Sequence, residues 1–185
     1  ILGTKFKQSG YILITHWGFS GPSILKLSAF AARLLSQMKY DFTVKINWIS
    51  KNEEITRNDL KFFFNSNSMI TNNIPFNIPK RLWEYLLNKN NICLQTVWSS
   101  LKIKQINKLV NCIVNDEYKV LGKTTFKEEF VTCGGIDLED INMSEMQSKL
   151  HKNIYFAGEI LNIDGITGGF NFQAAWTTGY IAGTN

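Results

Sequence analysis

The chain has 185 residues, enough for one domain, or one domain with an insertion, and for a substantial hydrophobic core. Hydrophobic residues make up 44% and charged residues 19% of the sequence, which excludes general disorder. Twenty Lys and Arg against fifteen Asp and Glu give a net charge of +5, but the lysines are scattered along the chain. This pattern favours a solvated basic surface, and we expect no nucleic-acid partner.

Cysteine content, hydrophobicity and the first residue indicate the cellular compartment and whether the sequence is part of a longer polypeptide. Three cysteines without paired spacing and only two histidines argue against a disulfide framework and a metal site, and they favour a reducing cytoplasm. No apolar stretch is long enough to cross a bilayer, so we expect no membrane partner. The chain opens at Ile1, without Met, in a strand-like pattern, so we expect a piece of a longer polypeptide.

The first 38 residues predict a strand, a turn and a helix. Residues 10–15 are typical of a buried strand, and residues 16–22 form a Gly- and Pro-rich turn. Pro22 suits the first turn of a helix. Apolar residues recur from Ile24 to Leu35 at helical spacing, which predicts an amphipathic helix ending near Lys39.

The middle of the chain differs from its flanks in having few glycines, many asparagines and no chemical motif. Residues 41–49 predict a strand, and helices are expected at 57–66, 79–89 and 102–111. We interpret residues 39–121 as an inserted, mainly helical domain. Residues 1–38 and 122–185 would then form a discontinuous core.

The last third predicts three strands and a closing helix. Strands are expected at 112–121, 126–132 and 153–157, and a helix at 169–183. A glycine-rich loop joins the last strand to this helix. The first N–H groups of a helix have no intrahelical acceptor and carry partial positive charge. Because glycine has no Cβ, a ligand with an electron-rich oxygen can lie directly against this backbone.

The motifs around this loop resemble a known family. The segments are Val131-Thr-Cys-Gly-Gly135, Ala157-Gly-Glu159, and Asp164-Gly-Ile-Thr-Gly-Gly-Phe-Asn171, together with Thr15-His-Trp-Gly-Phe-Ser-Gly-Pro22 near the start. They are similar to the BaiN-like, aminoacetone-oxidase-type family of bacterial NAD(P)/FAD-dependent oxidoreductases. The resemblance covers the C-terminal portion of that family, and the middle of this chain aligns only loosely.

The resemblance implies an α/β (α+β) fold, namely part of a two-dinucleotide-binding-domain flavoprotein with an inserted helical domain. It implies FAD as cofactor, NAD(P)H as a possible electron donor and hydride transfer to or from a small-molecule substrate. Glu159 matches the residue that contacts the ribityl chain, while Gly168, Gly169 and Asn171 match positions at the pyrimidine edge of the flavin. The further cofactor-binding positions that it implies are Gly134, Gly135, Gly158, Asp164, Gly165 and Thr167.

Two residues leave alternatives open. His16 is either a hydrogen-bonded turn residue or, as the family motif implies, a group over the flavin that orients substrate or donates a proton. Cys133 replaces the usual Ala of the family, and we expect a buried, inert thiol rather than a redox-active one. Asn162 and Ile166 also depart from the family pattern, which affects substrate preference more than cofactor binding.

The G-x-G-x-x-G turn that holds the ADP half of FAD is not found in this sequence. We therefore expect a preceding FAD-binding segment of the same chain as a partner. Two alternatives remain: a non-catalytic binding or structural module on a flavoprotein fold, and a basic RNA-binding domain.

Overall fold

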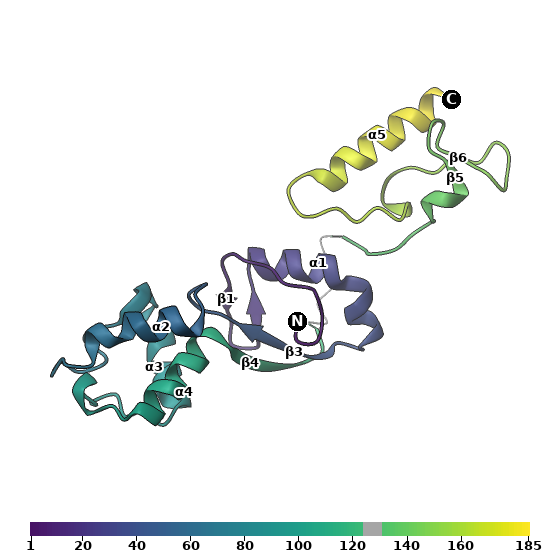
Figure 1. Cartoon of the computed structure of the whole chain (residues 1–185). Coiled ribbons are helices and arrows are strands. Elements are labelled where there is room, and N and C mark those ends of the chain that lie inside the picture. Colours follow the sequence, from purple (N-terminus) through teal and green to yellow (C-terminus); the bar gives the residue numbers. More distant parts are fainter. Residues whose placement is uncertain (124–130) are drawn as a thin grey trace. The chain divides into compact units, whose positions relative to one another are not determined.

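A computed structural model describes residues 1–123 and 131–185 (Figure 1). The chain forms two compact units. Unit 1 comprises residue 1 and residues 3–42 and 121–185, and unit 2 comprises residue 2 and residues 43–120. Most of the predicted strand at 126–132 falls outside the described residues. Within them, no helix is long and apolar enough to span a membrane.

The first part of unit 1 is a short hairpin followed by a helix. Strand β1 (Leu13–Ile14) pairs antiparallel with β2 (Phe19–Ser20), and the N–H of Thr15 donates to the carbonyl of Gly18 at 2.9 Å. The sequence indicated a longer first strand and did not indicate the second. Helix α1 (Pro22–Gln37) confirms the predicted helix. It starts after Gly21, whose φ of 99° and close approach to the Leu13 N–H leave no room for a Cβ.

The second part of unit 1 packs short elements around a small core. Strands β5 (Ile141–Asn142) and β6 (Gln147–Ser148) form an antiparallel hairpin. The 3₁₀ helices η4 and η5 cover Leu138–Asp140 and Gly158–Ile160. Helix α5 (Phe170–Thr184) confirms the predicted closing helix. The fully buried side chains here are Ile141, Met146 and Leu161.

The predicted strand at 153–157 is wrong. Only Tyr155 forms a single bridge, with Gln147. The backbone turns at both ends of this segment, since Asn153 and Gly158 have φ values of 64° and 76°. Ala157 is itself extended, with φ −148° and ψ 156°, but the left-handed residue on each side limits the segment to the single bridge at Tyr155.

Unit 2 is mainly helical. Strands β3 (Asp41–Ile46) and β4 (Asp116–Leu121), most of whose residues fall in this unit, lie side by side in a two-stranded sheet (Figure 1). The helices are α2 (Glu53–Leu60), α3 (Lys80–Lys89) and α4 (Ile103–Val114), with 3₁₀ turns η1 (Lys61–Phe63), η2 (Pro75–Asn77) and η3 (Trp98–Ser100). The predicted strand from 112 begins four residues later, because Cys112–Val114 continue α4 and are buried on its inner face.

Two tryptophans centre the core of unit 2. The rings of Trp83 and Trp98 stack with centroids 6.0 Å apart, and both side chains are fully buried. The indole N–H of Trp83 donates to the carbonyl of Ile70 at 2.9 Å, which satisfies its one polar atom. This core is contiguous and lies wholly within unit 2.

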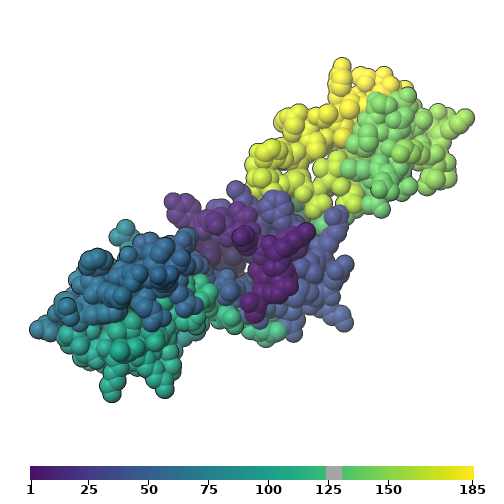
Figure 2. Space-filling view, in the orientation of Figure 1, coloured from purple at the N-terminus to yellow at the C-terminus, as the bar shows by residue number. Residues whose placement is uncertain are grey.

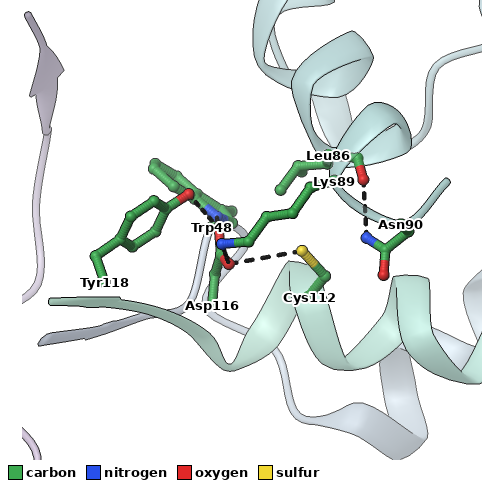
Figure 3. A network of polar contacts seen from close by, with 7 residues as sticks. All are labelled: Trp48, Leu86, Lys89, Asn90, Cys112, Asp116 and Tyr118. Atoms are coloured by element: carbon green, nitrogen blue, oxygen red, sulfur yellow. Dashed lines mark hydrogen bonds and ion pairs between the residues drawn. The ribbon is translucent and has the colours of Figure 1, made fainter. Parts of the chain in front are cut away.

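A buried carboxylate connects three elements of unit 2 (Figure 3). Asp116, 2% exposed, accepts hydrogen bonds from Trp48 Nε1 at 3.0 Å and Lys89 Nζ at 2.6 Å, and from the hydroxyl of Tyr118. The Cys112 thiol lies 3.6 Å from the same carboxylate. A charge in this position is tolerated because several donors surround it.

This cluster shifts the pKa of its members. Burial, then the Asp116 hydrogen bond, raises the pKa of Tyr118 above its usual range, and burial raises the pKa of Cys112. Partial burial opposes protonation of Lys89, but Asp116 outweighs it and the pKa of Lys89 is raised. All three groups are therefore held in their protonated forms.

Candidate functional site

The glycines at 134 and 135 bring two distant segments of unit 1 together. The Ile136 N–H donates to the carbonyl of Ile160, and the Asn162 N–H donates to the carbonyl of Ile136, both at 2.9 Å. A Cβ on Gly135 would lie 2.5 Å from the Ile160 oxygen. Only glycine permits this approach, and it places residues 132–135 beside 158–161.

Glu159 lies at the edge of this pairing. Its side chain is exposed, and its carboxylate accepts a hydrogen bond from the N–H of Thr132 at 3.1 Å. The preceding Gly158 is connected to α5, because its N–H donates to the hydroxyl of Thr178 at 3.0 Å. The predicted residues Gly134, Gly135, Gly158 and Glu159 therefore form one contiguous group.

Asn171 fixes the glycine-rich loop to the start of α5. Its side-chain oxygen accepts from the N–H of Gly165 at 2.7 Å, and its side-chain nitrogen donates to the carbonyl of Gly165 at 2.9 Å. These paired bonds satisfy both ends of one amide and hold the loop in a single conformation. Two residues expected at the same site are thus in direct contact.

The N-terminus of α5 is open. Gly169 precedes the helix with φ 90°, and apart from its own chain neighbours no atom of the described residues lies within 4 Å of the position its Cβ would take. Thr167, Gly168 and Gly169 are exposed. No side chain of the described residues caps the helix. Its first N–H groups are consequently accessible, at the positive end of a 15-residue helix.

Asp164 interacts with helix α1, unlike the glycines around it. Its carboxylate is 3.8 Å from Arg33 Nη2, and Arg33 also donates to the side-chain oxygen of Asn162. A hollow of about 480 Å³ in unit 1 is lined by polar and apolar side chains: Phe6, Phe30, Arg33, Gln37, Cys133 and Asp164. The sequence analysis did not identify Arg33 as a site residue, because it lies in an ordinary amphipathic helix and no motif surrounds it.

The expectation that the Cys133 thiol is buried is wrong, because its side chain is exposed. The glycines that follow it turn the chain outward, with φ values of 121° and 136°. Limited burial and the Asp164 carboxylate raise the pKa of the Cys133 thiol. A protonated thiol is a weak nucleophile at neutral pH.

His16 lies in the turn of the β1–β2 hairpin, where its ring contacts Trp17 edge-on at 4.0 Å. Within residues 1–123 and 131–185, no hydrogen bond or ion pair joins it to the group at 158–171. Both side chains are exposed. The two interpretations of His16 therefore stay open.

Thr178 is a site residue that the sequence analysis missed. It is 6% exposed and is the one buried position of α5. Its hydroxyl donates to the carbonyl of Ala174 at 2.7 Å while it accepts from the Gly158 N–H. The one available signal was a threonine within an apolar helix, about two turns after its start.

The arrangement suits a flat, electron-rich ring. The open space at Gly169 admits a ring against the backbone, and the helix N-terminus stabilises negative charge at the ring edge. The pyrimidine edge of a flavin has this character, since negative charge develops there on reduction. The residues present thus fit the flavin half of FAD.

Comparison with known proteins decides the family. Residues 4–185 match the family described as HI0933-like protein Rossmann domain. The chain belongs to this family. The match confirms the resemblance to BaiN-like flavoproteins and the α/β fold class. The HI0933-like proteins are flavoproteins, and the cofactor they imply for this chain is FAD.

Three relatives show what the family does elsewhere. The chain is 28% identical to a ribosomal RNA dihydrouridine synthase of Escherichia coli over 96% of its length, and 29% identical to that of Haemophilus influenzae over 91%. It is 26% identical to a 3-dehydro-bile acid delta(4,6)-reductase of Clostridium scindens over 96%. The matches cover 42%, 40% and 44% of these relatives, so the chain spans about two fifths of their length.

Proposed function

We propose that this chain is the flavin-edge portion of an FAD-dependent reductase that saturates a carbon–carbon double bond conjugated to a carbonyl. The observation that carries the proposal is the open, glycine-framed N-terminus of α5, fixed in place by the Asn171–Gly165 pair. The printed names of the relatives support the reaction class. Dihydrouridine is uridine in which the carbon–carbon double bond of the uracil ring is reduced, and a delta(4,6)-reductase of a 3-dehydro compound reduces double bonds conjugated to a ketone.

The reaction needs two electrons and two protons in total. A hydride adds to the carbon β to the carbonyl and a proton to the α carbon, which gives the saturated carbonyl compound. FAD, once bound and reduced by two electrons, would supply the hydride. The residues of this chain would bind and orient: the first amides of α5 would stabilise charge at the ring edge, and Asn171 would keep the loop in position.

Several finer expectations stay predictions within this proposal. They are NAD(P)H as the electron donor, a preceding FAD-binding segment, Glu159 at the ribityl chain, His16 as proton donor and a cytoplasmic location. The small-molecule substrate and the lack of a nucleic-acid partner are likewise untested. The structural groups at 134–135, 158–159 and 164–171 support the cofactor contacts without identifying the substrate.

The test compares two glycine substitutions in the complete polypeptide. Gly169→Ala places a Cβ in the space proposed for the ring, whereas Gly122→Ala has nearly the same φ, 96°, and is equally open with respect to the part of the chain that the structure describes. Both variants place an alanine at a positive φ, so both add backbone strain. We expect Gly169→Ala to weaken FAD binding at least about tenfold and Gly122→Ala to leave it unchanged, as measured by titration of flavin fluorescence.

Two results would contradict the proposal. One is equal FAD affinity of the two variants, and the other is a complete protein without flavin absorbance after incubation with FAD. The second result would favour the alternative of a non-catalytic module on a flavoprotein fold. A flavin-loaded protein that oxidises NAD(P)H only when an enone is added would support the reaction class.

A further inference from the structure

Helix α5 makes hydrogen bonds to both ends of the segment 158–165, which lies before it in the chain. At one end, the N–H of Gly158 donates to the hydroxyl of Thr178 at 3.0 Å. At the other end, the N–H of Gly165 donates to the side-chain oxygen of Asn171 at 2.7 Å, and the Asn171 amide donates back to the Gly165 carbonyl at 2.9 Å. One rigid element therefore fixes both ends of this segment.

Asn171 and Thr178 lie on the same face of α5. They are seven residues apart, which is about two turns and about 10 Å along the helix axis. Thr178 is the one buried position of the helix, and Asn171 is half-buried. Helix α5 contributes to the surface of unit 1 (Figure 2, yellow), and its side chains Phe172, Trp176 and Tyr180 are exposed. The face with Asn171 and Thr178 is thus the one that contacts the segment 158–165.

The Thr178 hydroxyl is an acceptor for Gly158. Its proton is donated to the carbonyl of Ala174 at 2.7 Å, with a longer contact to the carbonyl of Ala175 at 3.3 Å. A hydroxyl has one proton and two lone pairs, so these bonds within the helix leave a lone pair for the N–H of Gly158. The bond to Gly158 joins residues 20 positions apart, so it connects the helix to a distant turn.

The turn at Gly158 packs directly on α5. A Cβ at Gly158 would lie 3.9 Å from the Cβ of Ala175, one turn of the helix before Thr178. Gly158 itself has φ 76°, in the left-handed region that favours glycine. The turn is therefore held against α5 by a packing contact and by the Thr178 hydrogen bond. Without the hydroxyl, the half-buried N–H of Gly158 would have to move toward water to find an acceptor.

Glu159 is placed by this turn because it follows Gly158 directly. Its carboxylate accepts a hydrogen bond from the N–H of Thr132 at 3.1 Å, beside the close approach of Gly135 to residues 160 and 161. A rotation of the Gly158 peptide would displace the Glu159 carboxylate from this pairing. The position of Glu159 relative to the first amides of α5 therefore depends on Thr178.

We propose that Thr178 is a positioning residue of the flavin site, whose hydroxyl holds the Gly158–Glu159 turn in a fixed place relative to the N-terminus of α5. The inference rests on the function proposed above, in which the α5 amides contact the ring edge and Glu159 contacts the ribityl chain. Asn171 holds one end of the segment and Thr178 the other, so two groups that bind one cofactor keep their spacing. Thr178 is buried and acts through Gly158, without contact to the cofactor.

The test compares four substitutions in the complete polypeptide. Thr178→Val keeps the shape of the side chain and removes the hydroxyl, and Thr178→Ala removes the hydroxyl without crowding the site. Thr178→Ser retains the hydroxyl. The matched control is Thr177→Val, because Thr177 is exposed on the same helix and its hydroxyl accepts from the Gln173 side chain at 3.2 Å.

Three measurements are made on each variant. Titration of flavin fluorescence gives the affinity for FAD, a redox titration followed by visible absorbance gives the midpoint potential of bound FAD, and thermal unfolding followed by circular dichroism reports the fold. We expect Thr178→Val and Thr178→Ala to bind FAD about tenfold more weakly, because a half-buried N–H loses its partner. Their midpoint potential should fall, since a displaced helix N-terminus stabilises the negative charge of reduced flavin less well.

Thr178→Ser should bind FAD within about threefold of the parent with the same potential, and Thr177→Val should match the parent. Parent-like affinity and potential in folded Thr178→Val or Thr178→Ala, even with lower thermal stability, would overturn the inference and leave Thr178 a structural role alone. A loss in Thr178→Ser as large as that in Thr178→Val would also overturn it, because the effect would then belong to the methyl group. Either result in a parent protein that binds FAD leaves the proposed function intact, whereas a parent that binds no FAD refutes both.

Discussion

Gly134 and Gly135 are adjacent residues with similar backbones and different surroundings. Both have φ in the left-handed region, at 121° and 136°. A Cβ at Gly134 would meet none of the described atoms within 4 Å, whereas one at Gly135 would meet backbone atoms of residues 160 and 161 at 2.5 to 2.8 Å. Backbone cannot move aside as a flexible side chain can, so only the second position is sterically closed.

We therefore predict that Gly135→Ala destabilises unit 1 by about 3 kcal/mol, from overpacking together with backbone strain. Gly134→Ala should cost about 1 kcal/mol, because it adds strain alone. Thermal unfolding of unit 1, followed by circular dichroism, measures both changes. Equal effects of the two substitutions would show that residues 132–135 do not pack on 158–161.

This difference explains how much of the site could be predicted from sequence. The glycines at 134, 135, 165, 168 and 169 marked the two segments in which the site lies, and a local pattern is enough for that. It could not show that Gly135 meets Ile160 or that Asp164 meets Arg33, because these contacts join segments far apart in the chain. Exposure of Cys133 was also missed, since it depends on the same pairing.

Among the elements, most helices and strand β3 (Asp41–Ile46, predicted within 41–49) were predictable, whereas the short strands were not. Helices α1, α3 and α5 lie within a few residues of their expected ranges, because apolar spacing and Pro22 or Pro79 act locally. Short strands depend on partners elsewhere: β2, β5 and β6 have only two residues each and gave no periodic signal. Val114 extended α4 where alternation had indicated a strand.

The Asp116 cluster connects β4 to α3 and to the segment after β3. Removal of its charge leaves Lys89 without its counter-ion beside a buried site, so we predict that Asp116→Asn lowers the free energy of unfolding of unit 2 by about 3 kcal/mol. The control is Asp59→Asn, which breaks the exposed pair with Lys51 and should cost less than about 1 kcal/mol. Urea unfolding followed by tryptophan fluorescence measures both variants.

The same cluster predicts a stability loss at alkaline pH. Tyr118, Lys89 and Cys112 all have pKa values raised by folding, so the stabilisation they provide is fully present below their unfolded pKa values. It is lost as pH rises through about 9 to 12, where the unfolded chain releases these protons first. Urea midpoints across this range should fall steeply for the parent and less steeply for Asp116→Asn. A parallel fall in the two proteins would contradict the role of Asp116.

At the scale of the whole molecule, the two units differ in how they bury apolar surface. Trp83 and Trp98 of unit 2 are at most 1% exposed, whereas Trp17 and Trp176 of unit 1 are 67% and 71% exposed. Helix α5 also exposes Phe172 and Tyr180. Unit 2 thus has a complete core of its own, while unit 1 leaves large aromatic side chains uncovered.

We predict that residues 41–121 fold when they are produced alone. Their core lies within the segment, and their two ends are held together because β3 and β4 are hydrogen-bonded neighbours. The segment should unfold in one cooperative transition with a free energy near 5 kcal/mol, and its near-ultraviolet signal should report the stacked Trp83–Trp98 pair. Leu109→Ala, at a fully buried position, should lower that free energy by about 3 kcal/mol and keep the transition cooperative. A segment with helical far-ultraviolet but no near-ultraviolet signal would contradict the prediction, because it would show that the helices form while the core stays unpacked.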